Sequence, residues 1–402
     1  MALFAEKADL RLPGPTAIPP QVERAMQATW RHPMMDYRNP EFAGLLRETC
    51  EKARAVFGTS GDVVLLAGSG TSALETAMVN VAGPGETVVL CVAGFFGEYF
   101  AGIAQRRGLR VVRVEAAWGE PIPPEAVARA LRDHPEARAV FVTHSETSTG
   151  VLNPIDAIAA VVREHGDALV VVDAVSSLGG TPVEMDRWGI DVVASCSQKA
   201  LMLPPGLALV ALGERAWQVI RRRQAPSFYF DLRQYEAMVE RGAPPYTPNV
   251  ALVAGLREAL RLMEQEGLPN VYRRHRLLQA MTRSAVQALG WQCAAPDGFA
   301  SPTLTSVRFE FMDADAFRAV LRQRMGVAVG GGLGPWRGRV LRLGHMGYCD
   351  AGDVLKMVAA LEAAAAWAGL AVPLGAGVEA AQRVWLDSVQ ESTIRAGEGA
   401  RP

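Results

Sequence analysis

The sequence predicts an α/β fold in which a large domain holds a mostly parallel sheet of seven strands and a smaller α+β domain follows. Three observations predict this fold. From about residue 60 to 215, short apolar runs alternate with longer amphipathic ones. Half of the 402 residues are hydrophobic, which allows a sizeable core. After Gly213 the pattern becomes helical, and a new mixture of strands and helices begins near residue 290.

Seven apolar runs are expected to form the strands of the large sheet. They are hydrophobic throughout, which is typical of parallel strands that helices cover on both faces. The runs are "DVVLLAG" (62–68), "ETVVLCVAG" (86–94), "RVVRVEA" (110–116), "ARAVFVTH" (137–144), "DALVVVDAV" (167–175), "DVVASCS" (191–197) and "LALVALG" (207–213). Helices are expected between the first five strands, at 71–82, 98–108, 123–134 and 155–166.

The second half of the chain divides into helices and a small sheet. Helices are expected at 214–224, 250–267 and 269–290, and the last is long enough to link two domains. The small sheet is expected from "TLTSVRFEF", "VAVGGG" and "RVLRLGHMG", with helices at 313–325 and 352–369. We therefore expect an N-terminal arm (1–12), a large domain (13–268), a small domain with its linking helix (269–385) and a flexible tail (386–402).

Composition argues against several classes of protein. Lysine plus arginine (41) balances aspartate plus glutamate (42), so the chain has no basic excess for a nucleic-acid partner. The five scattered cysteines and six isolated histidines show no metal-ligand spacing. The sequence contains no uninterrupted apolar run of about 18 residues and no signal-peptide pattern. We expect a cytoplasmic protein with reduced thiols, no metal and no membrane.

The residues that follow the strands carry the chemistry, because ligands of open α/β sheets bind at the carboxyl ends of the strands. Lys199, in "SCSQKALMLPPG", is surrounded by small and apolar residues, which would lower its pKa and make its amine nucleophilic. A carbonyl compound would convert that amine into an imine. Asp173 ends another apolar run with no cation in the "AVSSLGG" that follows, so it needs a partner from elsewhere or serves as an N-cap.

Three further stretches gain a function if a cofactor lies between Lys199 and Asp173. Gly68–Thr71 opens a helix and is either a capped turn or a phosphate cradle. Phe95 and Phe96 are either core residues or a platform for a flat ring, and "SETSTG" (145–150) is either a turn or a set of hydrogen-bond donors. Pyridoxal 5′-phosphate has the aldehyde, ring nitrogen and phosphate that these stretches would bind.

The same stretches resemble a known family. "SGT" at 69–71, "THSETSTGVLNPID", "VVDAVSSLGGTPVEMDRWGID" and "SCSQKALMLPPG" are similar to class V, fold-type I pyridoxal-phosphate enzymes. Within these they most resemble alanine–glyoxylate and serine–glyoxylate (serine–pyruvate) aminotransferases. The resemblance runs from "PGPTAIPP" near residue 13 to about 344, and its block around Lys199 is the most specific.

The resemblance implies a role for each matching residue. Lys199 would be the Schiff-base lysine and general base, and Asp173 the partner of the ring nitrogen. Arg342 would clamp the substrate carboxylate, for which a bidentate guanidinium is well suited. The remaining contacts would be Ser69, Gly70, Thr71 and Gln198 at the phosphate, Phe96 and Ser148 at the ring, and Gly14 and Tyr37 beside the substrate.

The resemblance also implies a homodimer whose partner subunit closes over the phosphate. Thr247 matches the threonine of that clamp, whereas Pro244 falls where relatives have a tyrosine, so Tyr246 is the candidate stand-in. A second departure is "MMDYRNPEF", which has Tyr37 and Arg38 where relatives often have a histidine near the substrate.

The function that the resemblance implies is transamination from alanine or serine to glyoxylate or pyruvate. Two alternatives stay open at this stage. One is another class V chemistry: ureidoglycine–glyoxylate or aminoethylphosphonate transamination, a lyase, or a desulfurase that would use Cys349. The other is a non-catalytic module that binds pyridoxal phosphate, although no DNA-binding extension is attached.

Overall fold

The computed structural model of the chain describes residues 9–31 and 36–398. Its large sheet has seven strands in the order β2-β10-β9-β8-β5-β3-β4, and β10 alone runs antiparallel to its neighbours. The strands are β2 (Asp62–Gly68), β3 (Thr87–Val92), β4 (Arg110–Glu115), β5 (Ala139–Thr143), β8 (Leu169–Asp173), β9 (Val192–Cys196) and β10 (Gly206–Leu212). The predicted mostly parallel, seven-stranded sheet is confirmed.

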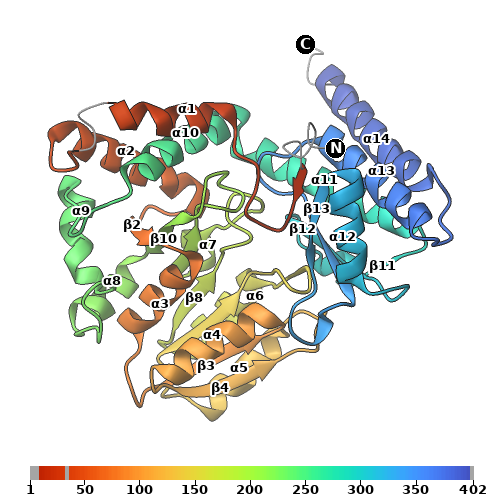
Figure 1. Cartoon of the computed structure of the whole chain (residues 1–402). Coiled ribbons are helices and arrows are strands. Elements are labelled where there is room, and N and C mark those ends of the chain that lie inside the picture. The colour runs from red at the N-terminus through yellow and green to blue at the C-terminus, as the bar shows by residue number, and fades with distance from the viewer. Residues whose placement is uncertain (1–8, 32–35, 399–402) are drawn as a thin grey trace.

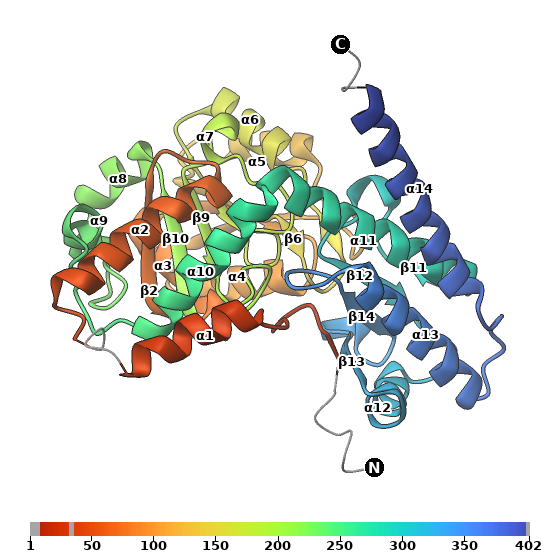
Figure 2. The same cartoon turned by 90° about the horizontal axis from the view of Figure 1, so that it is seen from above.

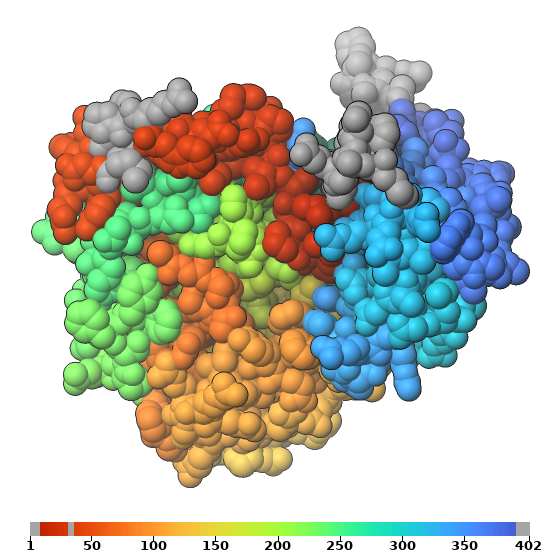
Figure 3. Space-filling view, in the orientation of Figure 1, coloured from red at the N-terminus to blue at the C-terminus, as the bar shows by residue number. Residues whose placement is uncertain are grey.

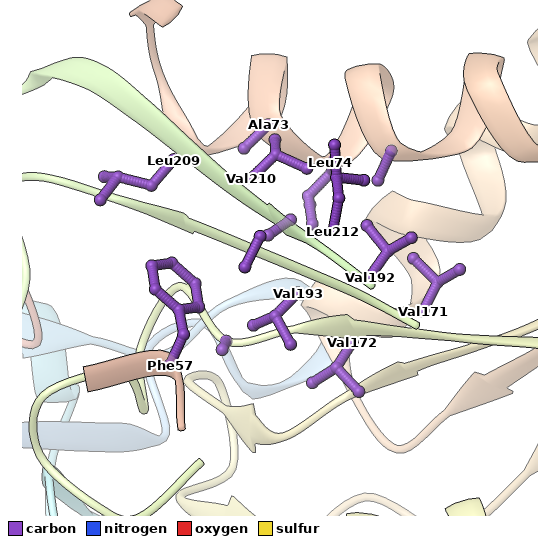
Figure 4. Close-up of a cluster of buried hydrophobic side chains, with 14 of the residues drawn as sticks. Phe57, Ala73, Leu74, Val171, Val172, Val192, Val193, Leu209, Val210 and Leu212 are labelled. Atoms are coloured by element: carbon purple, nitrogen blue, oxygen red, sulfur yellow. The ribbon is translucent and has the colours of Figure 1, made fainter. Parts of the chain in front are cut away.

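Helices cover both faces of this sheet, as the hydrophobic strands require (Figure 1). Figure 4 shows Ala73 and Leu74 on one side of the central strands and Phe57 on the other. All residues of β8 and β9 are buried, and each fully buried valine or leucine side chain contributes about 1.5–3 kcal/mol to stability. The covering helices include α2 (Pro40–Phe57), α3 (Gly70–Val81), α4 (Phe95–Arg106), α5 (Pro124–Asp133), α6 (Ile155–His165), α8 (Glu214–Arg221) and α10 (Val250–Glu266).

The smaller sheet has the order β1-β13-β14-β12-β11. Its strands are β1 (Asp9–Arg11), β11 (Gln292–Cys293), β12 (Leu304–Arg308), β13 (Val327–Gly331) and β14 (Val340–Gly344). The N-terminal strand β1 pairs in parallel with β13, so the start of the chain joins the C-terminal unit (Figure 2). The helices of this unit are α11 (Leu268–Ala288), α12 (Ala314–Met325), α13 (Ala351–Trp367) and α14 (Ala376–Glu398).

Two hydrophobic clusters correspond to the two sheets. Helix α11 spans both clusters, with Val271 in the first and Leu278 in the second. The division at 268/269 remains our proposal, and α11 is the linking helix in it. The expectation of a flexible tail from 386 needs a correction, because helix α14 continues to Glu398 and packs against α11 and α13. No helix in residues 9–31 and 36–398 combines the length and apolar character of a membrane span.

Candidate active site

Lys199 and Asp173 lie at the same edge of the large sheet. Asp173 is the last residue of β8 and pairs in register with Ala194 of the neighbouring parallel strand β9. Lys199 follows β9 in the next turn, and its Nζ donates a hydrogen bond to the carbonyl oxygen of Pro13. Burial lowers the pKa of Lys199, and the nearby Arg342 guanidinium lowers it further, against the opposing effects of Cys196 and Asp173.

The N-terminal segment closes over this lysine. The nitrogen of Thr16 donates to the carbonyl of Gln198 at 3.2 Å, and its hydroxyl donates to the carbonyl of Lys199 at 2.9 Å. Gly14 has φ +93°, and a Cβ there would lie 2.7 Å from the Lys199 Nζ, so only glycine fits against the amine. Figure 3 shows this segment (red) between the surfaces of the large domain and the C-terminal unit (blue).

Asp173 is a buried carboxylate without a cationic partner. It is 3% exposed, accepts a hydrogen bond from the Val175 nitrogen at 2.9 Å and has the Thr143 hydroxyl at 3.5 Å. No lysine, arginine or histidine forms an ion pair with it in the described part of the chain. Burial raises the pKa of Asp173 to about 7. The carboxyl group is therefore available to a ligand that offers an N–H.

The first turn of α3 has the features of an anion site. Ser69 is the N-cap and is exposed, yet its side chain makes no capping hydrogen bond. A Cβ on Gly70 would lie 3.0 Å from Val175, so the backbone packs closely there. The Thr71 hydroxyl lies 3.4 Å from that of Tyr99, and the buried Oε1 of Gln198 has no hydrogen-bond partner. Open helix N–H groups and an unpartnered polar atom fit a phosphate group.

Phe96 and Ser148 are held together by a residue to which sequence reasoning gave no role. Phe96 lies in the first turn of α4, edge-on to Phe95 at 5.5 Å. Its backbone nitrogen donates to the carboxylate of Glu146, as does the Ser148 hydroxyl at 2.6 Å. The only signal in the sequence was a single acidic residue within the hydroxylic run "SETSTG".

Arg342 reaches the site from the small sheet. Its side chain leaves β14 and donates to two carbonyl oxygens, Gly331 at 2.6 Å and Thr147 at 3.2 Å. Among residues 9–31 and 36–398, no carboxylate forms an ion pair with it. Burial lowers the pKa of Arg342 to about 10, and Arg318 adds to this effect. A partly buried guanidinium without a counter-ion fits a substrate carboxylate.

The other predicted residues lie elsewhere on the surface of the chain. The hydroxyls of Tyr37 and Thr247 are 3.2 Å apart, and both residues line a surface pocket with Trp30 and Ala67. Tyr246 stacks on Tyr229 at 5.0 Å and donates its hydroxyl to the carbonyl of Phe228. No hydrogen bond joins Tyr37, Tyr246 or Thr247 to Lys199, Asp173 or Arg342 in the described part of the chain.

The mostly parallel sheet, with a lysine and a buried aspartate at one edge and an arginine that reaches them from the small sheet, is the arrangement of a fold-type I aminotransferase. The family model of class-V aminotransferases matches residues 10–335. The chain therefore belongs to the class-V aminotransferase family, and the predicted family, fold and enzyme class are confirmed.

Similar proteins with different names cover nearly the whole chain. The serine–glyoxylate aminotransferase of Methylorubrum extorquens is 37% identical over 383 residues, covering 92% of this chain and 94% of that protein. A soluble hydrogenase small subunit of Synechococcus sp. is 39% identical over 382 residues, covering 94% and 98%. Among solved structures, pyridoxamine–pyruvate aminotransferase from Mesorhizobium loti has a TM-score of 0.89 at 34% identity, covering 95% and 98%.

Proposed function

We propose that this aminotransferase holds pyridoxal 5′-phosphate at Lys199 and transfers the amino group of alanine or serine to glyoxylate or pyruvate. One observation carries the proposal: a buried carboxylate with no cation, Asp173, lies on the strand beside the one that leads to Lys199. When bound, the cofactor supplies an aldehyde for the lysine amine and an electron-withdrawing ring. The open first turn of α3 and the unpartnered Gln198 Oε1 suit its phosphate.

Lys199 and Asp173 have different roles in the proposed proton transfers. Because its pKa is lowered, Lys199 has a larger fraction of free amine near neutral pH than an exposed lysine has. Its Nζ would remove the Cα proton of the donor amino acid in the first half-reaction, and in the second it would deliver a proton to the carbon of the acceptor oxoacid that receives the amino group. The Asp173 carboxylate holds the proton on the ring nitrogen, and this ion pair compensates for its burial.

Arg342 binds and orients the substrate. Its guanidinium, which lacks a counter-ion in the described chain, binds the carboxylate that amino acids and oxoacids share. The backbone around it leaves little space, since a Cβ on Gly330 would lie 2.9 Å from Pro13 and 3.2 Å from Arg342. A compact site near the carboxylate favours donors as small as alanine and serine. The serine–glyoxylate relative from Methylorubrum extorquens supports the same choice.

A homodimer is part of this proposal. Thr247 lies on the surface with its hydroxyl 3.2 Å from that of Tyr37, and in the proposed dimer Thr247 closes over the phosphate of the partner subunit, while Tyr37 stays assigned to the substrate. Tyr246 donates its hydroxyl proton to the carbonyl of Phe228, so it would have to exchange this hydrogen bond for one to the phosphate. We also propose a cytoplasmic location, which agrees with the absence of disulfides among the five cysteines.

A desulfurase function is disfavoured by the surroundings of Cys349. The thiol is 5% exposed and receives a hydrogen bond from Arg11 at 2.8 Å. Burial raises the pKa of Cys349 to about 12, so the thiol stays protonated at neutral pH. A desulfurase cysteine needs to be mobile and reactive, and this one is neither exposed nor ionised.

Two experiments test the proposal. Borohydride reduction of the protein with bound pyridoxal phosphate, followed by peptide mapping, should find the pyridoxyl adduct on Lys199. Adding L-alanine or L-serine should then convert the visible spectrum of the bound cofactor to that of pyridoxamine phosphate. An unlabelled Lys199 peptide would refute the cofactor assignment. Conversion by ureidoglycine or aminoethylphosphonate alone would refute only the choice of donor.

A further inference from the structure

Glu146 is a fully buried carboxylate that the proposed mechanism does not use. It ends strand β6 (Ser145–Glu146), which forms a small hairpin with β7 (Val151–Leu152), and its exposure is 0%. In the described part of the chain, no lysine, arginine or histidine is within ion-pair distance of it. A buried carboxylate of this kind is costly unless several hydrogen bonds compensate for its lost hydration.

The compensating hydrogen bonds come from α4 and from Ser148. The backbone nitrogens of Phe96 and Gly97 donate to the carboxylate at 3.1 and 3.0 Å. The nitrogen and the hydroxyl of Ser148 donate to it at 3.1 and 2.6 Å. Both carboxylate oxygens are therefore occupied, which leaves Glu146 no free oxygen for acid–base chemistry with a substrate.

These bonds close the N-terminus of α4. The N-cap, Gly94, has no side chain to offer, and the first four N–H groups of a helix need acceptors from outside the helix. The Ser148 Oγ accepts from Phe95 at 3.0 Å, and Glu146 accepts from Phe96 and Gly97. A Cβ on Gly94 would lie 2.5 Å from the Ser148 Oγ and 2.7 Å from Glu146, so the cap fits tightly against the helix.

The same bonds decide what Ser148 can offer a ligand. Its hydroxyl has one proton, which it donates to Glu146, and its oxygen accepts from Phe95. Ser148 is thus oriented by Glu146 rather than free to donate to a cofactor. Phe96 and Ser148 are both assigned to the cofactor ring, and one carboxylate fixes both of them.

We propose that Glu146 is a positioning residue of the cofactor site, which sets the backbone of Phe96 and the hydroxyl of Ser148 so that the coenzyme ring is bound in one orientation. The inference rests on the proposed function, because it takes pyridoxal phosphate as the ligand. A cap that served stability alone would stabilise α4 equally well but would leave cofactor affinity unchanged.

The chain offers a matched control in Glu362. This carboxylate is 4% exposed and accepts from the backbone nitrogens of Gly375, Gly377 and Val378 at 2.7, 2.8 and 3.0 Å. It therefore closes the start of α14 from α13, as Glu146 closes α4 from β6. Glu362 belongs to the C-terminal unit and bonds to no residue of the proposed site.

The test compares Glu146→Gln with Glu362→Gln. In each variant the glutamine NH2 group replaces a carboxylate oxygen and cannot accept the hydrogen bonds of the backbone N–H groups that face it. The cofactor-free form of both variants should therefore have a lower melting temperature than the cofactor-free wild type. Titration of the cofactor-free proteins with pyridoxal 5′-phosphate, followed by visible absorbance and circular dichroism, should show affinity weakened by about tenfold or more in E146Q alone. The dichroism of the bound cofactor should also change in E146Q alone. Equal affinity and equal dichroism in wild type and E146Q would overturn the inference.

A double-mutant cycle with Phe96→Leu tests whether Glu146 affects cofactor affinity through Phe96. If Glu146 acts through Phe96, the loss of affinity from E146Q should be smaller in the F96L background, whereas additive losses would overturn that route. If E146Q does not fold, Ser148→Ala replaces it, because it removes one donor from Glu146 and the acceptor of Phe95. S148A should then weaken binding, and unchanged binding would overturn the inference. A wild-type protein that binds no pyridoxal phosphate would instead refute the proposed function.

Discussion

Helices α3 and α4 both begin at the carboxyl edge of the large sheet, and their first turns differ. Ser69 leaves the first turn of α3 uncapped, whereas Glu146 and Ser148 occupy the first N–H groups of α4. Each first turn has the same partial positive charge and the same need for acceptors. The protein caps α4 with its own carboxylate, and in our proposal the uncapped first turn of α3 binds the phosphate of the cofactor.

The same contrast extends to the buried charged side chains. Asp173 and Arg342 lack counter-ions in the described part of the chain, whereas Asp191, equally buried, is bonded to the Val170 nitrogen and to Arg163. We call groups of the first kind, which have no counter-ion and spare hydrogen-bond capacity, open groups; closed groups are buried charged side chains whose charge is satisfied by an ion pair or by several hydrogen bonds. Substituting an open group should reduce function at little cost in stability, and substituting a closed group that contacts no residue of the site should do the reverse.

The largest effect is expected from Asp173→Asn. We expect kcat to fall about a hundredfold or more, because the ring nitrogen loses its anionic partner. Stability of the cofactor-free variant should not fall at pH 8, since an uncompensated buried carboxylate is removed. Asp191→Asn is the matched closed group and should lose stability but little turnover. Chemical denaturation and steady-state kinetics measure both, and a large loss of stability in D173N would contradict the open-group description.

Asp173 also predicts a pH dependence. Burial raises its pKa in the folded protein to about 7 from an ordinary 3.8, so between these values the folded state binds more protons than the unfolded state. The contribution of this group to stability therefore falls as pH rises from about 4 to about 7. Denaturation of the cofactor-free protein across this range should show a downward slope that D173N reduces. If the slope is unchanged in D173N, the pH dependence of stability comes from other titratable groups.

An intermediate effect is expected from Arg342→Lys. The lysine keeps the charge but loses the bidentate geometry, so KM for the amino acid and the oxoacid should rise about a hundredfold. The affinity for pyridoxal phosphate should change by much less, because Arg342 is assigned to the substrate. Substrate titrations of the cofactor-loaded variant measure this difference. Equal losses for cofactor and substrate would mean that Arg342 organises the whole site.

A smaller effect is expected from Thr71→Val at the open first turn of α3. Removing the hydroxyl should weaken pyridoxal-phosphate binding about tenfold, because one hydrogen bond to a charged phosphate is lost. Affinity for pyridoxal, which has no phosphate, should be the same in the variant and the wild type. Equilibrium titration with both ligands separates a phosphate contact from a general disturbance of α3, which would weaken both.

The smallest functional effect is expected from Glu362→Gln, a closed group of the C-terminal unit that bonds to no residue of the proposed site. Its carboxylate closes α14 through three backbone nitrogens, so the variant should lose about 1–3 kcal/mol of stability. Turnover and substrate KM should stay within about twofold of the wild type. A marked loss of turnover in a folded E362Q protein would show that closed groups also act on the site over a distance.

The boundaries of two helices could not be predicted from the sequence. The pattern predicts a helix over 98–108, whereas α4 spans Phe95–Arg106. The earlier start depends on Glu146, which is 50 residues away from Phe96 in the chain and supplies the missing acceptor. The tail is a similar case, since Glu362 closes the start of α14 and contacts with α11 and α13 follow. Local periodicity contains no information on either contact.

The sequence by itself determined the seven-stranded sheet and the places of Lys199 and Asp173 after their strands, because apolar runs and the residues that follow them are local features. The family and Arg342 followed from the resemblance of sequence motifs. Only the tertiary structure decided which groups are open and which are closed. Whether a polar group has a hydrogen-bond partner depends on elements that are distant in sequence. The carbonyl of Pro13 accepts from Lys199, and the carboxylate of Glu146 accepts from the Phe96 nitrogen. Such partners meet only when the chain has folded.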